Sequence, residues 1–204
     1  MKTMKKYVSG VLATVLAVVM TLSMSACGIS KEDPKAAAEK AVTSMLAAVK
    51  KADFNEASKY TVSGNTWSDF SDDEEMGIEV LKPILNKMSY TISSSEQKDD
   101  NTVSVSVDIN TIDSEKMFET VMTNVISEAM TNPDWAQDGD AVEQKMMEMM
   151  KETVDSTSDK VSNTIVLKVV KQDKTWKISD DIDETAFANA ITGNLMDAVQ
   201  NIGF

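Results

Sequence analysis

The sequence predicts an α+β domain in which helices pack on a four-stranded antiparallel sheet. Over much of the chain, apolar residues recur at the spacing of an amphipathic helix. In two places the period changes to strict alternation of apolar and polar residues, in paired runs that a polar turn joins. The order is three helices, a hairpin, two helices, a second hairpin and a final helix. Two hairpins supply four strands, and the amphipathic helices need a sheet to cover.

The first two helices are expected to begin at aspartate caps. Asp33 precedes Pro34, a residue favoured at the first helical position, and apolar residues then follow helical spacing over residues 34–50. Asp53 and Glu56 have the spacing of a capping box, which predicts a short helix to about Tyr60. The next stretch, TVSGNTWSDF, is expected to be a loop.

A third helix is predicted to open at a second capping box, formed by Ser71 and Glu74. Pro83 lies inside it and must kink or restart it, because proline donates no backbone hydrogen bond. The residues expected to point inward are Met76, Val80, Leu81, Ile84 and Leu85.

Two hairpins account for the four strands. In the first, Met88, Tyr90 and Ile92 alternate with polar residues before the turn KDDN, and alternating valines follow from Val103 to Ile109. In the second, alternation around Leu167 leads to the turn KQDK and then to Trp176. Each hairpin is expected to have one apolar face.

Two further helices are predicted between the hairpins, and one after them. Asp113 caps the first, over residues 114–130, and the stretch TNPDWAQDG breaks it. Asp140 with Glu143 starts the second, which ends near residue 156. Asp183 caps the last helix, over residues 184–201. The apolar stripe of helix 114–130 comprises Met117, Phe118, Val121, Met122, Val125, Ile126 and Met130.

The start of the chain has the three parts of a secretory signal. Lysines open it, residues 7–30 carry no charge, and small residues lie near the end of the apolar run. The stretch MSACG resembles the lipobox of bacterial lipoproteins, with Met24 where leucine is commoner. Cys27, the single cysteine of the chain, directly follows Ala26. This pattern predicts cleavage before Cys27 and a diacylglycerol on its thiol, which would anchor the protein to the membrane.

Two other interpretations of the leader are an uncleaved membrane helix and plain secretion with a cut at SMS. Neither explains a lone cysteine at this position. The expected organisation is therefore a signal peptide over residues 1–26, a lipidated cysteine and tether over 27–32, and a single α+β domain over 33–204. The location is the extracytoplasmic face of the cell membrane.

Composition excludes several classes of function. The formal net charge is −13, and loss of the three leader lysines takes it to −16, so nucleic acid would be repelled. The chain contains no histidine and no arginine, the commonest general base and the bidentate anion binder. With the single cysteine acylated, disulfides, thiolate catalysis and zinc–thiolate sites are excluded as well. No cofactor is expected.

Two segments resemble a known fold family. AAVKKADFNEASKYT is similar to the helix, link and second helix that open many nuclear-transport-factor-2-like and cystatin-like domains. VVKQDKTWKIS is similar to their closing hairpin, in which a tryptophan packs under the sheet. The resemblance implies a cone-like domain and an uncharacterised bacterial lipoprotein, with two inserted helices between the hairpins. It also implies that Trp176 packs near Val42 and Leu46.

Methionines make the inserted helices the candidate site. The two helices carry seven of them, and in the stretch KMMEMM Met146, Met149 and Met150 fall on one helical stripe. Core packing explains that stripe best, while an adaptable binding surface and a copper site are alternatives. Any ligand-binding pocket is predicted to be walled by Met117, Val121, Met122, Met146 and Met150, with Trp135 at its rim.

Acidic stretches offer weaker candidates. DWAQDGDAVEQK places Asp134, Asp138 and Gly139 as in a calcium-binding EF-hand loop, but Ala136 and Lys145 occupy ligand positions. A calcium site built from scattered acids stays open. The acidic runs 72–75 and 180–184 are interpreted as helix caps.

The function expected is non-enzymatic binding of an apolar small molecule or an envelope protein. The alternative is a small isomerase or hydrolyase that uses carboxylates alone. Its candidate acid, Asp108, is expected opposite the valine face of its strand.

Overall fold

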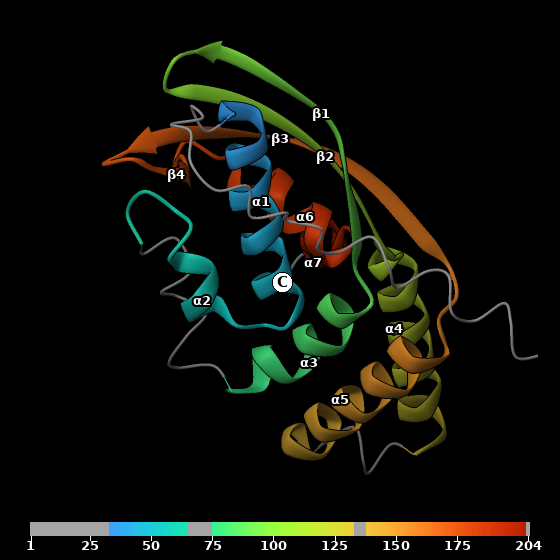
Figure 1. Ribbon diagram of the computed structural model, residues 1–204. Coiled ribbons are helices and arrows are strands. Elements are labelled where there is room, and N and C mark those ends of the chain that lie inside the picture. Colours follow the sequence, from blue (N-terminus) through green and yellow to red (C-terminus); the bar gives the residue numbers. More distant parts are fainter. Residues whose placement is uncertain (1–32, 65–74, 133–137, 203–204) are drawn as a thin grey trace, which may run out of the picture. The chain divides into compact units, whose positions relative to one another are not determined.

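The computed structural model of the protein describes residues 33–64, 75–132 and 138–202, all within one compact unit, Glu32–Phe204. The predicted α+β class and element order are confirmed, except that two helices replace the final one (Figure 1). The elements are α1 (Pro34–Lys50), α2 (Phe54–Ser58), α3 (Glu75–Asn86), β1 (Ser89–Asp99), β2 (Thr102–Ile112), α4 (Ser114–Thr131), α5 (Gly139–Ser156), β3 (Lys160–Gln172), β4 (Thr175–Ile178), α6 (Glu184–Thr192) and α7 (Leu195–Ile202).

The sheet is antiparallel, with its strands in the order β1-β2-β3-β4. In the central strand β2, the side chains alternate between buried and partly exposed, as the sequence predicts. Val105 lies opposite Leu167 of β3 on the buried face, and Asp108 lies opposite Thr164 on the other face. Because each strand has one apolar side, helices are needed on only one face.

The larger core lies between this apolar face and α1 and α6 (Figure 1). Val42 and Leu46 of α1 are fully buried there, together with Phe187 of α6. Trp176 of β4 belongs to the same cluster and is only 5% exposed. The predicted burial of this tryptophan beside the first helix is confirmed.

A second core joins α3, α4, α5 and α7 at the end of the sheet where β2 ends and β3 begins (Figure 1). Ile84 of α3 and Ile112 of β2 are buried in it. The two inserted helices therefore share a core of their own with α3 and α7. The other buried members are Met117, Phe118, Val121, Val125, Met150, Val154 and Ala198.

Most helix starts are those the sequence predicts, and α5 is the exception. Asp33, Asp53, Asp113 and Asp183 each accept a hydrogen bond from a backbone N–H in the first turn of their helix. Helix α5 is capped by Asp138, whose carboxylate accepts from the N–H of Ala141 at 3.2 Å. The predicted start at Asp140 was therefore wrong, because an earlier aspartate with extended backbone angles can cap one more half-turn of helix.

The predicted single helix over residues 184–201 was also wrong. Gly193 and Asn194 both have positive φ, 69° and 65°, so α6 ends there and α7 starts anew. The side chain of Asn189 joins the two helices, because its amide donates to Asp197 at 2.8 Å and its oxygen accepts from the N–H of Asp197 at 3.2 Å. Helix α3, by contrast, runs through Pro83 without restarting. Residues 71–74, its predicted cap, lie outside the described residues.

Candidate binding surface

The structure brings together five of the six predicted pocket residues. Met117, Val121 and Met150 are at most 7% exposed in the second core. Met122 and Met146 are partly buried and pack against that core. The sixth residue, Trp135, lies outside the described residues. Three of the five described residues are therefore core, and the predicted ligand-binding pocket stays a prediction.

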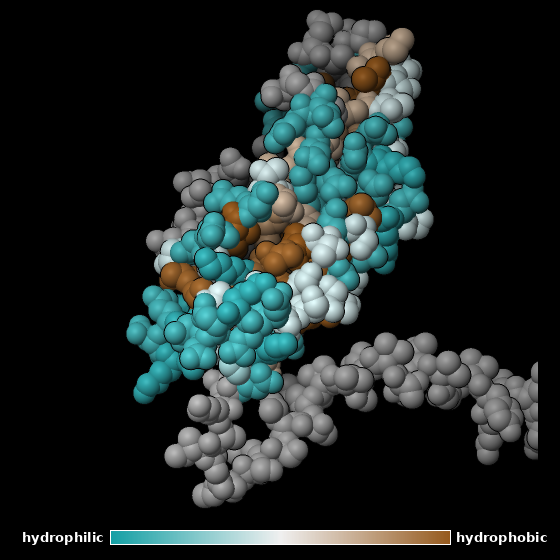
Figure 2. All heavy atoms as spheres, turned by 90° about the horizontal axis from the view of Figure 1, so that it is seen from above, coloured by the Kyte–Doolittle hydropathy of each residue, from teal (hydrophilic) through white to brown (hydrophobic). Residues whose placement is uncertain are grey.

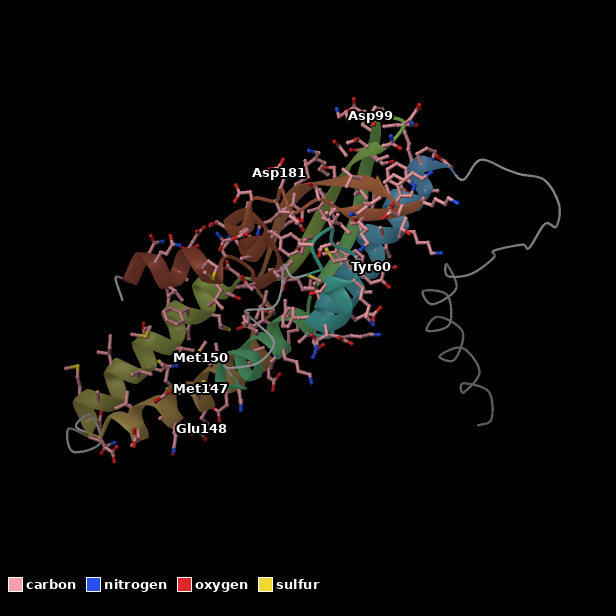
Figure 3. All side chains as sticks on the ribbon, turned by 90° about the vertical axis from the view of Figure 1, so that its left-hand side faces the viewer. Tyr60, Asp99, Met147, Glu148, Met150 and Asp181 are labelled. Carbon is pink, nitrogen blue, oxygen red and sulfur yellow. The ribbon has the colours of Figure 1, made fainter. Side chains whose placement is uncertain are left out.

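The stretch KMMEMM lies on α5, and its methionines divide between core and surface. Met150 is buried, and Met146 and Met149 pack against the second core, so the predicted core packing of this stripe is confirmed. Glu148 lies on the outer side of α5 (Figure 3), where its carboxylate is 2.6 Å from the ammonium group of Lys145.

Lys87 fixes the end of α5 to the chain that follows α3. Its ammonium group donates to the backbone oxygen of Val154 and, at 3.3 Å, to that of Asp155. The last carbonyl groups of a helix have no partner within the helix and carry its negative dipole end, so a lysine there is favourable. The end of helix α5 is therefore held by a charged hydrogen bond as well as by the second core.

Exposed apolar side chains concentrate on α4 and α7. Among the described residues, five large hydrophobic side chains are exposed, and four of them lie on these two helices. The helices pack against each other, since Ala198 of α7 is buried in the same cluster as Phe118 of α4. We call the four residues the α4–α7 patch: Ile126, Met130, Met196 and Val199.

The α4 half of the patch continues a row that starts in the core. Residues four apart lie on the same side of a helix, and exposure rises along the row from 7% at Phe118, through partly buried Met122, to 55% at Ile126 and 80% at Met130. The apolar stripe expected from the sequence included Ile126 and Met130. The stripe was therefore wider than the core that covers it, and its outer edge faces solvent.

The two helices that carry the patch are acidic. The described residues of α4 and α7 include four carboxylates, Glu115, Glu119, Glu128 and Asp197, and a single lysine, Lys116. The ammonium group of Lys116 lies 3.0 Å from a carboxylate oxygen of Asp159. That hydrogen bond raises the pKa of Lys116 and holds its charge on a pair outside the patch.

Acidic residues elsewhere cap helices or form hydrogen bonds between loops. Asp138, a candidate calcium ligand, caps α5, and Asp183 caps α6. Asp180 accepts from both the N–H and the hydroxyl of Ser63, at 3.2 and 3.1 Å. In the described part of the chain, no three Cys, Asp or Glu side chains gather closely enough to hold a metal ion. Asp134 lies outside it.

The candidate catalytic acid lies on the open face of the sheet. Asp108 is partly exposed, and the hydroxyl of Thr164 donates to its carboxylate at 2.7 Å. The hydroxyl of Tyr90 donates to the backbone oxygen of Thr43 on α1 at 3.1 Å, and that of Tyr60 to Glu56 at 3.2 Å. Both tyrosine hydroxyls are engaged in these structural hydrogen bonds, and Asp108 lies on the side of the sheet away from the apolar core.

No protein-family model matches the chain, and no curated protein sequence matches it. A solved structure is similar to it in fold. This is a protein of Bacillus subtilis subsp. subtilis str. 168 described as a "putative lipoprotein (ycdA)", with 13% sequence identity and a TM-score of 0.52. The match covers 78% of this chain and 56% of the ycdA protein, so the chain corresponds to little more than half of its neighbour.

The lengths and hydropathies of the described helices bear on whether any of them could cross a bilayer. None of them combines the length and the hydropathy that crossing a membrane requires.

Proposed function

We propose that the protein is a lipid-anchored extracytoplasmic lipoprotein that binds an envelope protein without catalysing a reaction. Two independent observations support the anchor. The leader ends in the lipobox-like stretch MSACG, and the structural neighbour from Bacillus subtilis is itself described as a lipoprotein. In this proposal Cys27 carries the lipid. A single acyl chain binds a membrane only weakly, whereas a diacylated cysteine supplies the two chains that stable anchoring requires.

The observation that carries the binding role is the α4–α7 patch. Large apolar side chains exposed to water are unfavourable, and when they gather on one surface of a folded domain they commonly mark an interaction site. Methionine suits such a surface because its side chain adapts to different partners. The buried members of the predicted pocket, Met117, Val121 and Met150, belong to the core cluster shared by α4, α5 and α7.

The resemblance to nuclear-transport-factor-2-like and cystatin-like domains stays a hypothesis about the fold family. Its support is that α1 lies against the apolar face of a four-stranded antiparallel sheet, with Trp176 buried between them. The carboxylate-dependent enzyme is the less favoured alternative, since its candidate acid is on the open face of the sheet.

The anchor is tested by mass spectrometry of protein extracted from bacterial membranes. The expected N-terminus is a diacylated Cys27, and a Cys27→Ala variant should appear in the soluble fraction or retain its leader. An unmodified Cys27 behind an intact leader in the wild-type protein would contradict the anchor.

The patch is tested with an environment-sensitive apolar dye and the mature chain carrying Cys27→Ser. The dye should bind, and binding should fall strongly in Ile126→Glu and Met130→Glu, both at exposed positions where the fold tolerates charge. Val166→Glu is the matched control, because Val166 is 68% exposed on the open face of the sheet. Equal dye binding by all four proteins would place the apolar site elsewhere. Dye binding to Met122→Glu and Met146→Glu then measures whether the predicted pocket contributes to the apolar site.

A further inference from the structure

The patch and the attachment point of the tether lie at opposite ends of the domain. Helix α1 runs antiparallel to β1, because the hydroxyl of Ser95 donates to Glu39 near the start of α1 at 2.5 Å, while Tyr90 bonds to Thr43 farther along. The start of α1 therefore lies near the β1–β2 turn, and α4 begins at the far end of β2 (Figure 1). A strand of 11 residues separates these ends, which is ~36 Å at ~3.3 Å per residue.

This arrangement disfavours the membrane itself as the occupant of the patch. The chain enters the described domain at Asp33, six residues after Cys27, so a lipid on Cys27 would tether the domain through the start of α1. Seen from the side of the β1–β2 turn, the surface is mostly hydrophilic, with hydrophobic residues in small areas (Figure 2). Carboxylates around the patch would also be repelled by anionic lipid headgroups.

The same charges disfavour a second copy of the chain. Two patches brought face to face would bring the carboxylates of Glu115 and Glu119 of both copies into one interface, and like charges across an interface are unfavourable. The single lysine on these helices, Lys116, is engaged with Asp159. A partner must therefore supply the positive charge.

Helical spacing defines the shape of that partner. Glu115, Glu119, Met122, Ile126 and Met130 follow one another at intervals of four or three residues, so they form one stripe along α4. The stripe is acidic at its start and apolar at its end. On α7, Met196 and Val199 form a second apolar pair three residues apart, on a helix that packs against α4. An exposed apolar row along a helix is the kind of surface to which the apolar face of a partner helix binds, and the α7 pair adds exposed apolar area on the neighbouring helix.

From this we infer that the α4–α7 patch binds a basic amphipathic helix of another envelope protein, at the end of the domain remote from the lipid anchor. This inference rests on the proposed function and names the class of partner. Apolar side chains of the partner contact Ile126, Met130, Met196 and Val199, and its lysines or arginines lie against Glu115 and Glu119. Charge gives the complex its orientation, and apolar contact gives most of its affinity.

The probe is a fluorescent peptide of ~18 residues, about five helical turns, with a leucine stripe and lysines elsewhere. Its matched control carries glutamate in place of every lysine. Binding to the mature Cys27→Ser chain is measured by fluorescence anisotropy at low and high salt. The basic peptide should bind, with weaker affinity at high salt, and the acidic peptide should bind at least about tenfold more weakly.

Variants locate the site. Ile126→Glu and Met130→Glu should each weaken binding of the basic peptide about tenfold or more, while Val166→Glu should leave it unchanged. Glu119→Lys should weaken binding severalfold and reduce its salt dependence, and should improve binding of the acidic peptide. Circular dichroism and thermal unfolding establish that each variant is folded.

Several outcomes would overturn the inference. Equal binding of both peptides would remove the role of charge, and equal losses in Ile126→Glu and Val166→Glu would remove the role of the patch. Stronger binding to anionic phospholipid vesicles than to the basic peptide, lost in Ile126→Glu, would replace the helix with a membrane surface. If the apolar dye binds at the patch but the basic peptide does not, the partner class is wrong while the proposed binding function stands.

Discussion

A Cβ atom on Gly193 would lie only 1.9 Å from the carbonyl oxygen of Ile112, the last residue of β2. The loop between α6 and α7 therefore touches the end of the central strand with no room for a side chain. Gly193 has a left-handed φ of 69°, and its carbonyl oxygen accepts from the N–H of Ser114 at 2.8 Å. One glycine thus joins β2, the start of α4 and the break between the last two helices.

Gly193→Ala should destabilise the protein by ~3 kcal/mol or more, because a clash with backbone cannot be relieved by rotating a side chain. Gly139→Ala is the control. Nothing lies within 4 Å of a Cβ there, so it should be neutral or slightly stabilising at the start of α5. Denaturant titration of both variants measures the difference. Equal stability would show that the loop can move away from β2.

Asp138→Ala should cost ~1 kcal/mol of stability, as expected for an N-cap whose carboxylate bonds to the first turn. Asp140→Ala should cost less, since its charge only complements the helix dipole. Urea unfolding of the two variants, run side by side, gives the ranking. The reverse ranking would restore Asp140 as the cap that the sequence pattern favours.

Trp176→Ala should cost ~3–5 kcal/mol, because it leaves a cavity between the sheet and α1. Trp176→Phe should cost much less. In the described structure the indole N–H of Trp176 is buried without a hydrogen-bond partner, so phenylalanine removes an unfavourable buried donor along with some volume. A loss below ~1 kcal/mol in the alanine variant of Trp176 would contradict the core position.

Lys171→Ala, which removes the ammonium group 5.8 Å from the centre of the Trp176 ring, should cost ~0.5–1 kcal/mol of stability.

Tyr90 should make stability decline at alkaline pH. Burial raises the pKa of its phenol above the ordinary 10.0, so the unfolded chain loses this proton at lower pH than the folded protein does. The contribution is complete below the unfolded pKa and is lost as pH rises through the folded value. Tyr90→Phe should cost ~0.5–1.5 kcal/mol at neutral pH through the lost bond to Thr43.

The alkaline difference between wild type and Tyr90→Phe should shrink as pH rises from about 8 to about 11, since the variant has no phenol to titrate. Lysines titrate equally in both proteins, so the difference isolates Tyr90. A difference that stays constant with pH would show that the phenol is not buried enough to favour its neutral form.

Local chemistry accounts for what the sequence predicted well. The helix starts at Asp33, Asp53, Asp113 and Asp183 depend on a side chain bonding to backbone two or three residues away, a contact that needs no tertiary partner. The alternation in β2 likewise follows from the geometry of a strand with one buried face. The α+β class, the two hairpins and the burial of Trp176 follow from these short-range patterns.

Long-range contacts account for what it predicted badly. The apolar pattern continues across Gly193 as if one helix ran through. The break there exists because β2 and α4 meet the loop, and those elements lie some eighty residues earlier, at Ile112 and Ser114.

The sequence by itself determined the element types, the candidate anchor at Cys27 and the apolar stripes of the two inserted helices. Only the tertiary structure decided which part of each stripe is covered. Met117 and Val121 became core because α3, α5 and α7 converge on them, whereas Ile126 and Met130 are left exposed on the same helix. Helical periodicity fixes the direction in which a side chain points, but burial depends on how far the neighbouring helices extend, and that is a property of the packed domain.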